Sequence, residues 1–140
     1  MTWEHAPLHR LGELADLVAA DPSLHVRFSA GPDRDASSGS RDGESGLELP
    51  GLSVNPLGAE RWWSRPLEDW LARQLCQYSH LAHAGGDRFA WVLRGAITGR
   101  GPDCEPLLIN IEPVAILQRE LLAEAERRYN DRFDVGNQPD

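Results

Sequence analysis

The first thirty residues change from a helical to a strand-like spacing of apolar positions. Leucine, alanine and valine recur every three or four positions over Leu8–Ala20, which predicts an amphipathic helix. Asp21-Pro22-Ser23 ends it, because proline disfavours the helical conformation of the residue before it. Apolar and polar residues then alternate from Leu24 to Ser29, so we expect a half-buried strand whose polar face carries Arg27.

The middle of the chain is polar and rich in turn-forming residues. Ala30–Gly46 consists mostly of Gly, Ser, Asp and Arg, so we expect a long loop that is either mobile or ordered by a ligand. Leu47–Val54 predicts one or two short strands broken at Pro50-Gly51, a dipeptide that suits a type II turn. A further turn follows at Asn55–Gly58.

The second half of the chain returns to regular patterns. Arg61–Ala84 predicts the strongest helix, with Pro66 suited to a first helical position. Arg88–Thr98 and Glu105–Ile111 predict two strands that pair as a hairpin. Val114–Tyr129 predicts a third helix.

This order of elements indicates the fold class. Helices and strands do not alternate strictly, and the last two strands are neighbours in sequence. We therefore expect a single α+β domain over residues 1–129, with a small, largely antiparallel sheet packed with about three helices. It would carry the long polar loop at 30–46, and residues 130–140 would form a flexible tail.

Charge and composition narrow the possible partners. The formal net charge of −8 disfavours non-specific binding to nucleic acid, whose affinity comes mainly from neutralised phosphates. All 14 basic residues are arginine, which excludes lysine-based catalysis. Cys76 and Cys104 lack CxxC spacing, so we expect buried free thiols. Neither a signal-peptide pattern nor an apolar run of about 18 residues is present, so we expect a cytoplasmic protein that makes no membrane contact.

Two familiar kinds of catalytic site do not fit the spacing. The pairs His5/His9 and His80/His83 have helical spacing, but no HExxH motif or Cys/His set accompanies them, so we expect no metal. Ser53 follows the first glycine of a GxSxG pattern, but the second glycine is missing. Because the nucleophile elbow of hydrolases needs small residues on both sides, we do not expect one here.

One set of residues remains as candidate chemistry. Arg27 lies on the first predicted strand, Ser53 in the next extended segment, and Glu105 at the start of the last strand. This layout resembles the Arg-Ser-Glu class of mono-ADP-ribosyltransferases. The resemblance implies that NAD is a substrate, that the arginine binds its phosphate, and that the serine supports the nicotinamide ribose. The glutamate would stabilise the oxocarbenium ion that forms as nicotinamide leaves.

The same resemblance suggests a cleft formed by the 27–56 region and Glu105, with loop 30–46 as its cover. Arg41 and Asn55 are the further ligand-binding residues that we expect there. The residues alone also allow a plainer interpretation, in which Arg27 and the glutamate are strand-edge charges and Ser53 is a packed hydroxyl.

A second resemblance covers nearly the whole chain. Residues 40–57, with Leu-Glu-Leu-Pro-Gly-Leu-Ser-Val-Asn at 47–55, are similar to a family of short, uncharacterised actinobacterial proteins, a domain of unknown function. Residues 66–75 and 91–95 carry the same similarity. It implies a bacterial cytoplasmic protein and transfers no activity.

Two functional hypotheses follow. The first is an ADP-ribosyltransferase-like protein that handles NAD, or more generally a protein that binds a small molecule or another protein in that cleft. The alternative is a non-enzymatic interaction or ligand-binding module. Its contact surface would be Trp62 and Trp63, which we then expect to be exposed, since aromatic residues anchor interfaces.

Overall fold

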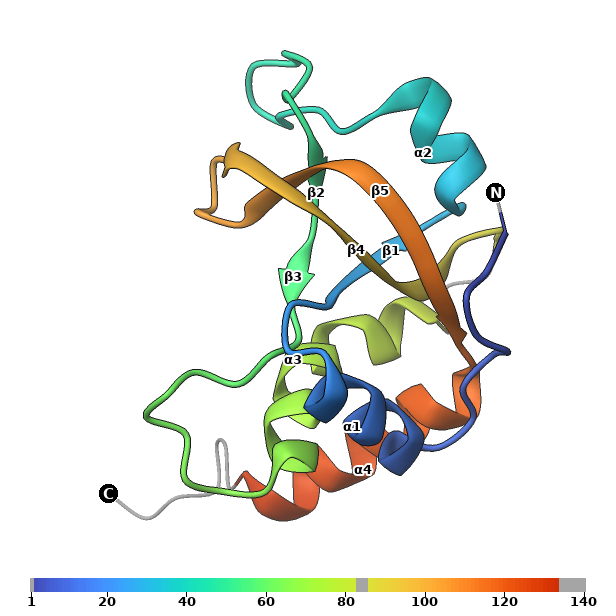
Figure 1. Ribbon diagram of the computed structural model, residues 1–140, viewed down its shortest axis with the longest axis vertical. Helices are drawn as coiled ribbons and strands as arrows, with labels where there is room; N and C mark the ends of the chain where they lie inside the picture. Colours follow the sequence, from blue (N-terminus) through green and yellow to red (C-terminus); the bar gives the residue numbers. More distant parts are fainter. Residues whose placement is uncertain (1, 83–85, 134–140) are drawn as a thin grey trace.

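The computed structural model describes residues 2–82 and 86–133. Within them the chain forms four helices and five strands, in the order α1 (Leu11–Ala20), β1 (His25–Ser29), α2 (Pro32–Ser38), β2 (Leu52–Ser53), β3 (Asn55–Pro56), α3 (Leu67–Ala82), β4 (Phe89–Arg100), β5 (Pro106–Leu117) and α4 (Arg119–Arg132). Helices α1, α3 and α4 gather on one side of the sheet (Figure 1). The expected α+β class is confirmed, with one more helix than expected.

The sheet curls until its two edges meet in one short segment. Its strand order is β2-β5-β4-β1-β3, and every neighbouring pair is antiparallel. β2 and β3 lie at opposite edges, yet Val54 alone separates them in the chain. The amide of Val54 donates to the carbonyl of Pro106 in β5 at 3.2 Å. Residues 52–56 therefore join the two edges, as the closing strand of a barrel does.

The curled sheet encloses a small core separate from the main one. The small core consists of Leu52, Val54, Trp91, Leu93 and Leu108. The larger core lies between the sheet and helices α1, α3 and α4. Strand β1 lies between these cores, so His25 on its polar face and Val26 on its apolar face are both buried. The prediction of a half-buried strand is wrong, because the sheet curls over the face that was expected to meet water.

Two helices begin later than the sequence predicts. α1 starts at Leu11, because the expected first residue, Leu8, pairs with the end of β5 instead. Its amide donates to the carbonyl of Ile116 at 2.8 Å. α3 starts at Leu67, directly after Pro66, as expected from Pro66 as a first helical position, although the predicted range began at Arg61. Proline lacks an amide hydrogen and favours the start of a helix, which explains this boundary.

The helix predicted at Val114–Tyr129 is wrong in its first turn. β5 continues to Leu117, and α4 begins only at Arg119. Val114 and Ala115 are both fully buried, so this end of the strand lacks the alternation that marks a half-buried strand. A fully buried strand and a buried helical turn have similar apolar sequences.

The predicted tail is shorter than expected. α4 continues to Arg132, so residues 130–132 are helical. Residues 134–140, the rest of that tail, lie outside the described residues.

The loop predicted at 30–46 contains a helix and a turn. Seven of its residues form α2, and Arg41 pairs with Glu48 across a turn. Asp35 and Ser40 are buried despite their polarity. The prediction failed because these side chains form hydrogen bonds inside the protein, which allows polar residues to be buried.

The structure also bears on the expectations about membrane spans and cysteines. No described helix is long and apolar enough to cross a membrane. Both cysteines are free thiols, as expected, but the expectation that both are buried is wrong. Cys76 is half-buried and Cys104 is exposed in the turn between β4 and β5.

Candidate functional site

Two adjoining surface pockets lie between the closing strand β2 and the tip of the β4–β5 hairpin. Their volumes are about 410 and 400 Å³. Ser53, Asp103 and Glu105 line both, so the two pockets form one feature, the double pocket. The first pocket also includes Arg41, Asp42, Gly43, Glu44, Leu49 and Pro102. The second also includes Asn55, Pro56, Arg100, Cys104 and Pro106.

The backbone of Ser53 is fixed on three sides. Ser53 pairs with Leu107 of β5. Its amide donates to Ser40 Oγ at 3.1 Å, and its carbonyl accepts from Arg27 Nη1 at 2.8 Å. These bonds occupy the backbone, and the residue lines the double pocket from a rigid position.

A tight turn positions Glu105. The amide of Gly101 donates to the Glu105 carbonyl at 2.8 Å, and the amide of Asp103 donates to Glu105 Oε2 at 3.2 Å. A Cβ at position 101 would lie only 1.5 Å from Glu105 Oε1. Glycine therefore allows the carboxylate to fold back over the turn. Cys104 completes the turn with a φ of 63°, a left-handed conformation that is uncommon outside glycine.

Arg41 and Asn55 lie on opposite sides of the double pocket. Arg41 lines the first pocket and donates from Nη1 to the carbonyl of Gly46 at 3.0 Å. Asn55 lines the second, and its Nδ2 donates to the hydroxyl of Tyr78 on α3. The structure thus brings together four of the five residues selected from the sequence: Ser53, Glu105, Arg41 and Asn55.

The fifth residue, Arg27, lines neither pocket and is engaged elsewhere. Its Nε donates to Asp35 Oδ2 at 2.7 Å and its Nη2 to Asp35 Oδ1 at 3.2 Å. Its Nη1 donates to the carbonyl of Ser53. All three guanidinium nitrogens therefore have partners, and the side chain is only 13% exposed. Arg27 holds helix α2 and strand β2 to strand β1.

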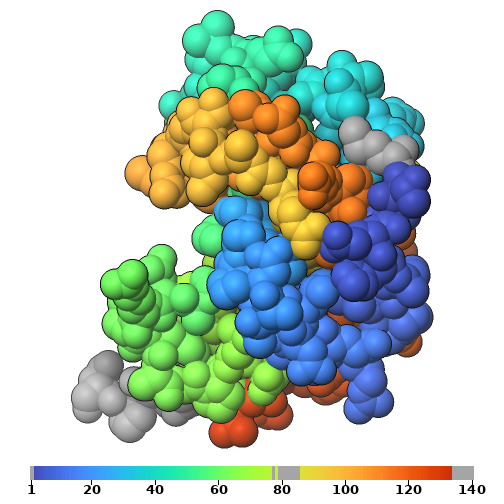
Figure 2. All heavy atoms as spheres, in the orientation of Figure 1, coloured from blue at the N-terminus to red at the C-terminus, as the bar shows by residue number. Residues whose placement is uncertain are grey.

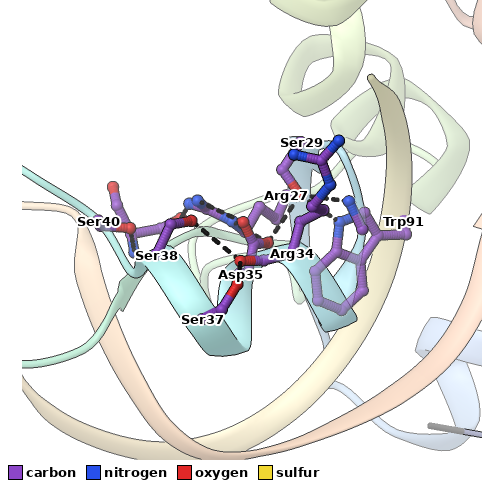
Figure 3. Close-up of polar contacts among 10 residues, drawn as sticks. Arg27, Ser29, Arg34, Asp35, Ser37, Ser38, Ser40 and Trp91 are labelled. Atoms are coloured by element: carbon purple, nitrogen blue, oxygen red, sulfur yellow. Dashed lines mark hydrogen bonds and ion pairs between the residues drawn. The ribbon is translucent and has the colours of Figure 1, made fainter. Parts of the chain in front are cut away.

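The sequence interpretation missed the rest of this network. Figure 3 shows Arg27, Ser29 and Trp91 gathered around Asp35 of α2. Ser29 Oγ donates to Asp35 Oδ2 at 2.7 Å and accepts from Trp91 Nε1 at 2.9 Å. One signal was available in the sequence. Arg27 and Ser29 share a strand face, and a carboxylate follows within a few residues.

Acidic groups outnumber basic ones around the double pocket. Its lining carries four carboxylates, those of Asp42, Glu44, Asp103 and Glu105, and two arginines. Both arginines donate to backbone carbonyls of their own turns, Arg41 as described and Arg100 to Cys104 at 3.3 Å. The hydroxyl of Ser45 and the amide of Glu44 donate to Asp42 and lower the pKa of its carboxyl group. This acid is therefore charged at neutral pH, and the site favours a cation.

Metal ligation has no support in the described part of the chain. Residues 2–82 and 86–133 contain no group of three His, Cys, Asp or Glu side chains placed to hold a metal ion. The predicted pair His80 and His83 falls outside the part whose side chains are described.

Comparison with known proteins gives a family and no activity. No curated protein and no solved structure matches the chain. One family model matches residues 2–138, which is nearly the whole sequence. The protein therefore belongs to the family described as "Family of unknown function (DUF6098)".

Proposed function

We propose that this protein is a binding module whose double pocket takes a cationic group, the ammonium or guanidinium of a small molecule or of a partner's basic residue. The observation that carries the proposal is the convergence of four carboxylates on one surface feature. We expect the carboxylate of Glu105 to contact the cation, because Glu105 lines both pockets.

The fixed positions of the polar groups support recognition. The Glu105 carboxylate is held by the Asp103 amide, and the Ser53 backbone is held by β5, Ser40 and Arg27. Groups that are already ordered lose little conformational freedom when a ligand binds. Each solvent-exposed ion pair contributes only about 0.2–1 kcal/mol. A small monocation should therefore bind no more tightly than a Kd of about 1 mM, and a larger ligand with several contacts would bind more tightly.

An NAD-handling, ADP-ribosyltransferase-like activity is a second candidate. The observation that favours it is that Ser53 and Glu105 line the same pockets, as the resemblance implies. Two observations favour the cation instead. Arg27, the expected phosphate ligand, is bonded to Asp35, and the lining is acidic where a dinucleotide carries two phosphates.

Calorimetric titration tests this proposal. Agmatine, which carries both an ammonium and a guanidinium, should give saturable heat at millimolar concentration. Glu105→Gln removes the charge but keeps an oxygen that can accept the Asp103 amide, so it should weaken binding by about 2- to 5-fold. Asp16→Asn, the same kind of change at an exposed site on α1, should leave binding unchanged. Heat with NAD and none with agmatine would instead favour the second candidate.

A further inference from the structure

A second surface, which shares no residue with the double pocket, gathers tryptophan and arginine. It consists of Trp62 and Trp63 in the β3–α3 connection, Arg65 and Arg73 near and on α3, and Arg132 at the end of α4. We refer to it as the Trp62 surface. Figure 2 shows the chain around residue 60, in green, as a lobe that projects at the lower left of the molecule.

The exposed indole of Trp62 packs on two other tryptophan rings. Trp62 is 67% exposed, as expected, whereas Trp63 is only partly exposed. Trp63 is half-buried against the main core, and its Nε1 donates to the carbonyl of Pro66 at 3.1 Å. The Trp62 ring meets the rings of Trp63 and Trp70 edge-on, with centroids 6.0 and 5.9 Å apart. Trp62 thus presents apolar area to solvent from a packed base.

Arginines surround the tryptophans. The guanidinium of Arg73 lies 5.6 Å from the centroid of the Trp70 ring, and that of Arg65 lies 5.7 Å from the Trp63 ring. Such stacking holds a guanidinium flat. Arg65 already donates from Nε to Asp69 Oδ2 at 3.1 Å and from Nη2 to the carbonyl of Arg132 at 3.0 Å, which leaves its Nη1 for a ligand.

A buried carboxylate beneath the surface is outnumbered by its partners. Asp69 is 1% exposed and lies within 4 Å of three guanidinium groups. Arg128 is at 2.7 Å, Arg65 at 3.0 Å and Arg132 at 3.9 Å. One negative charge cannot neutralise three positive ones, so the cluster carries excess positive charge. Arg65 and Arg132 expose 40% and 55% of their side chains and carry this excess to the surface.

We infer that the Trp62 surface docks a short acidic segment of a partner protein, with an apolar or aromatic side chain on Trp62 and carboxylates on the arginines. Tryptophan and arginine are the residue types that most often dominate binding energy at interfaces. Guanidinium groups bind carboxylates through paired hydrogen bonds. Nucleic acid is the less suitable polyanion, because its affinity requires many neutralised phosphates and the Trp62 surface offers only three arginines.

Fluorescence anisotropy of a labelled peptide tests this inference. The probe is a short peptide of alternating Asp and Glu residues around a central Phe-Leu pair. We expect saturable binding at micromolar protein concentration, weakened about 10- to 30-fold by Trp62→Ala and less strongly by Arg73→Gln. Ile97→Ala and Arg119→Gln change an exposed isoleucine and an exposed arginine elsewhere, and both should bind as the wild type does. Circular dichroism confirms that each variant is folded.

Several results would overturn the inference. Equal binding of the peptide with Asn and Gln in place of its acids would show that charge plays no part. Unchanged binding by both Trp62→Ala and Arg73→Gln would place the contact elsewhere. Tighter binding of a labelled oligothymidine would assign the surface to nucleic acid, and a dimer in sedimentation that Trp62→Ala dissociates would assign it to a second copy of the chain.

Discussion

The molecule contains two arginine–aspartate clusters, each around a buried carboxylate, that differ in the number of arginines per carboxylate. In the curled sheet, the single guanidinium of Arg27 faces the single carboxylate of Asp35, and its remaining nitrogen donates to the Ser53 carbonyl. Between α3 and α4, the single carboxylate of Asp69 faces three guanidinium groups. The first cluster has no guanidinium nitrogen without a partner, whereas the second has positive charge in excess.

This difference separates structural support from binding capacity. Arg27 is an arginine on a strand beside a serine, which is the pattern that suggested a phosphate ligand. Its partner Asp35 makes it part of the fold instead. Around Asp69, the arginines that the carboxylate cannot neutralise reach the surface beside Trp62. The ratio of carboxylates to arginines in a cluster therefore indicates whether an arginine can bind a ligand better than the position of that arginine on a strand does.

We expect the largest change in stability from replacement of Asp35. Asp35→Ala leaves Arg27 nearly buried without a counter-charge, which should lower the free energy of unfolding by about 3–5 kcal/mol. Urea denaturation measures it. Ser37→Ala changes an exposed residue on the same helix and should stay within about 0.5 kcal/mol of wild type. A loss for Asp35→Ala as small as for the control would mean that Arg27 does not depend on this partner.

Removing the carboxylate of the other cluster should cost less. Asp69→Asn leaves arginines that are 27%, 40% and 55% exposed and can turn towards water, so we expect a loss of about 1–3 kcal/mol. The same denaturation measures it, with Asp16→Asn as the exposed control. A larger loss than for Asp35→Ala would reverse the ranking of the two clusters.

The curled sheet should also be the acid-sensitive region. Burial lowers the pKa of His25, a hydrogen bond with the Ser23 backbone partly opposes the shift, and the charge of Arg100 adds to it. The unfolded chain therefore binds this proton more readily than the folded one. The contribution of neutral His25 to the free energy of unfolding should be fully present above about pH 6.5. It should be lost as the pH decreases towards the lowered pKa of His25 in the folded state.

Urea midpoints measured between about pH 7 and pH 5 check this prediction. The pKa of Asp69 is also lowered: burial acts to raise it, but the hydrogen bonds and charges of Arg128 and Arg65 outweigh burial. Asp69 therefore makes stability depend on pH only below about pH 4, outside the range of this experiment. His25→Leu should flatten the slope, and the exposed control His5→Gln should retain it. An unchanged slope in His25→Leu would remove His25 as its cause.

The smallest expected effect on stability is at Gly101. An alanine Cβ there meets only the end of a flexible side chain, Glu105 Oε1, so the carboxylate must move while the backbone need not. Gly101→Ala should change stability by less than about 0.5 kcal/mol. It should nevertheless weaken agmatine binding as Glu105→Gln does. Wild-type binding by a folded Gly101→Ala protein would contradict the role given to the position of Glu105.

The parts of the fold predicted correctly depend on local patterns. The strand β1 and the hairpin of β4 and β5 follow from neighbouring residues, and both are present. Helix α2 could not be predicted in this way, because its buried Asp35 is stabilised by Arg27 and Ser29 of β1, outside the helix. The role of residues 52–56 is equally non-local. They pair with β5 and β1, which only the curl of the sheet brings within reach.

The candidate site shows the same limit. Ser53 and Glu105 could be selected by residue type and strand position, and they do line a common feature. The placement of Arg27 outside it depends on a bond to a helix that the polarity of residues 30–46 concealed. Asp103 lines both pockets as well, but nothing in its local sequence distinguishes it from an ordinary turn residue.

Amide chemical-shift mapping during parallel titrations with agmatine and NAD distinguishes a cation from a dinucleotide as the ligand of the double pocket. We expect agmatine to shift the amides of Ser53, Asp103 and Cys104 in a saturable manner. NAD at the same concentration should leave these amides and the Arg27 side-chain Nε–H unchanged. Saturable shifts of Arg27 and Ser53 with NAD, and none with agmatine, would contradict a cation as the ligand.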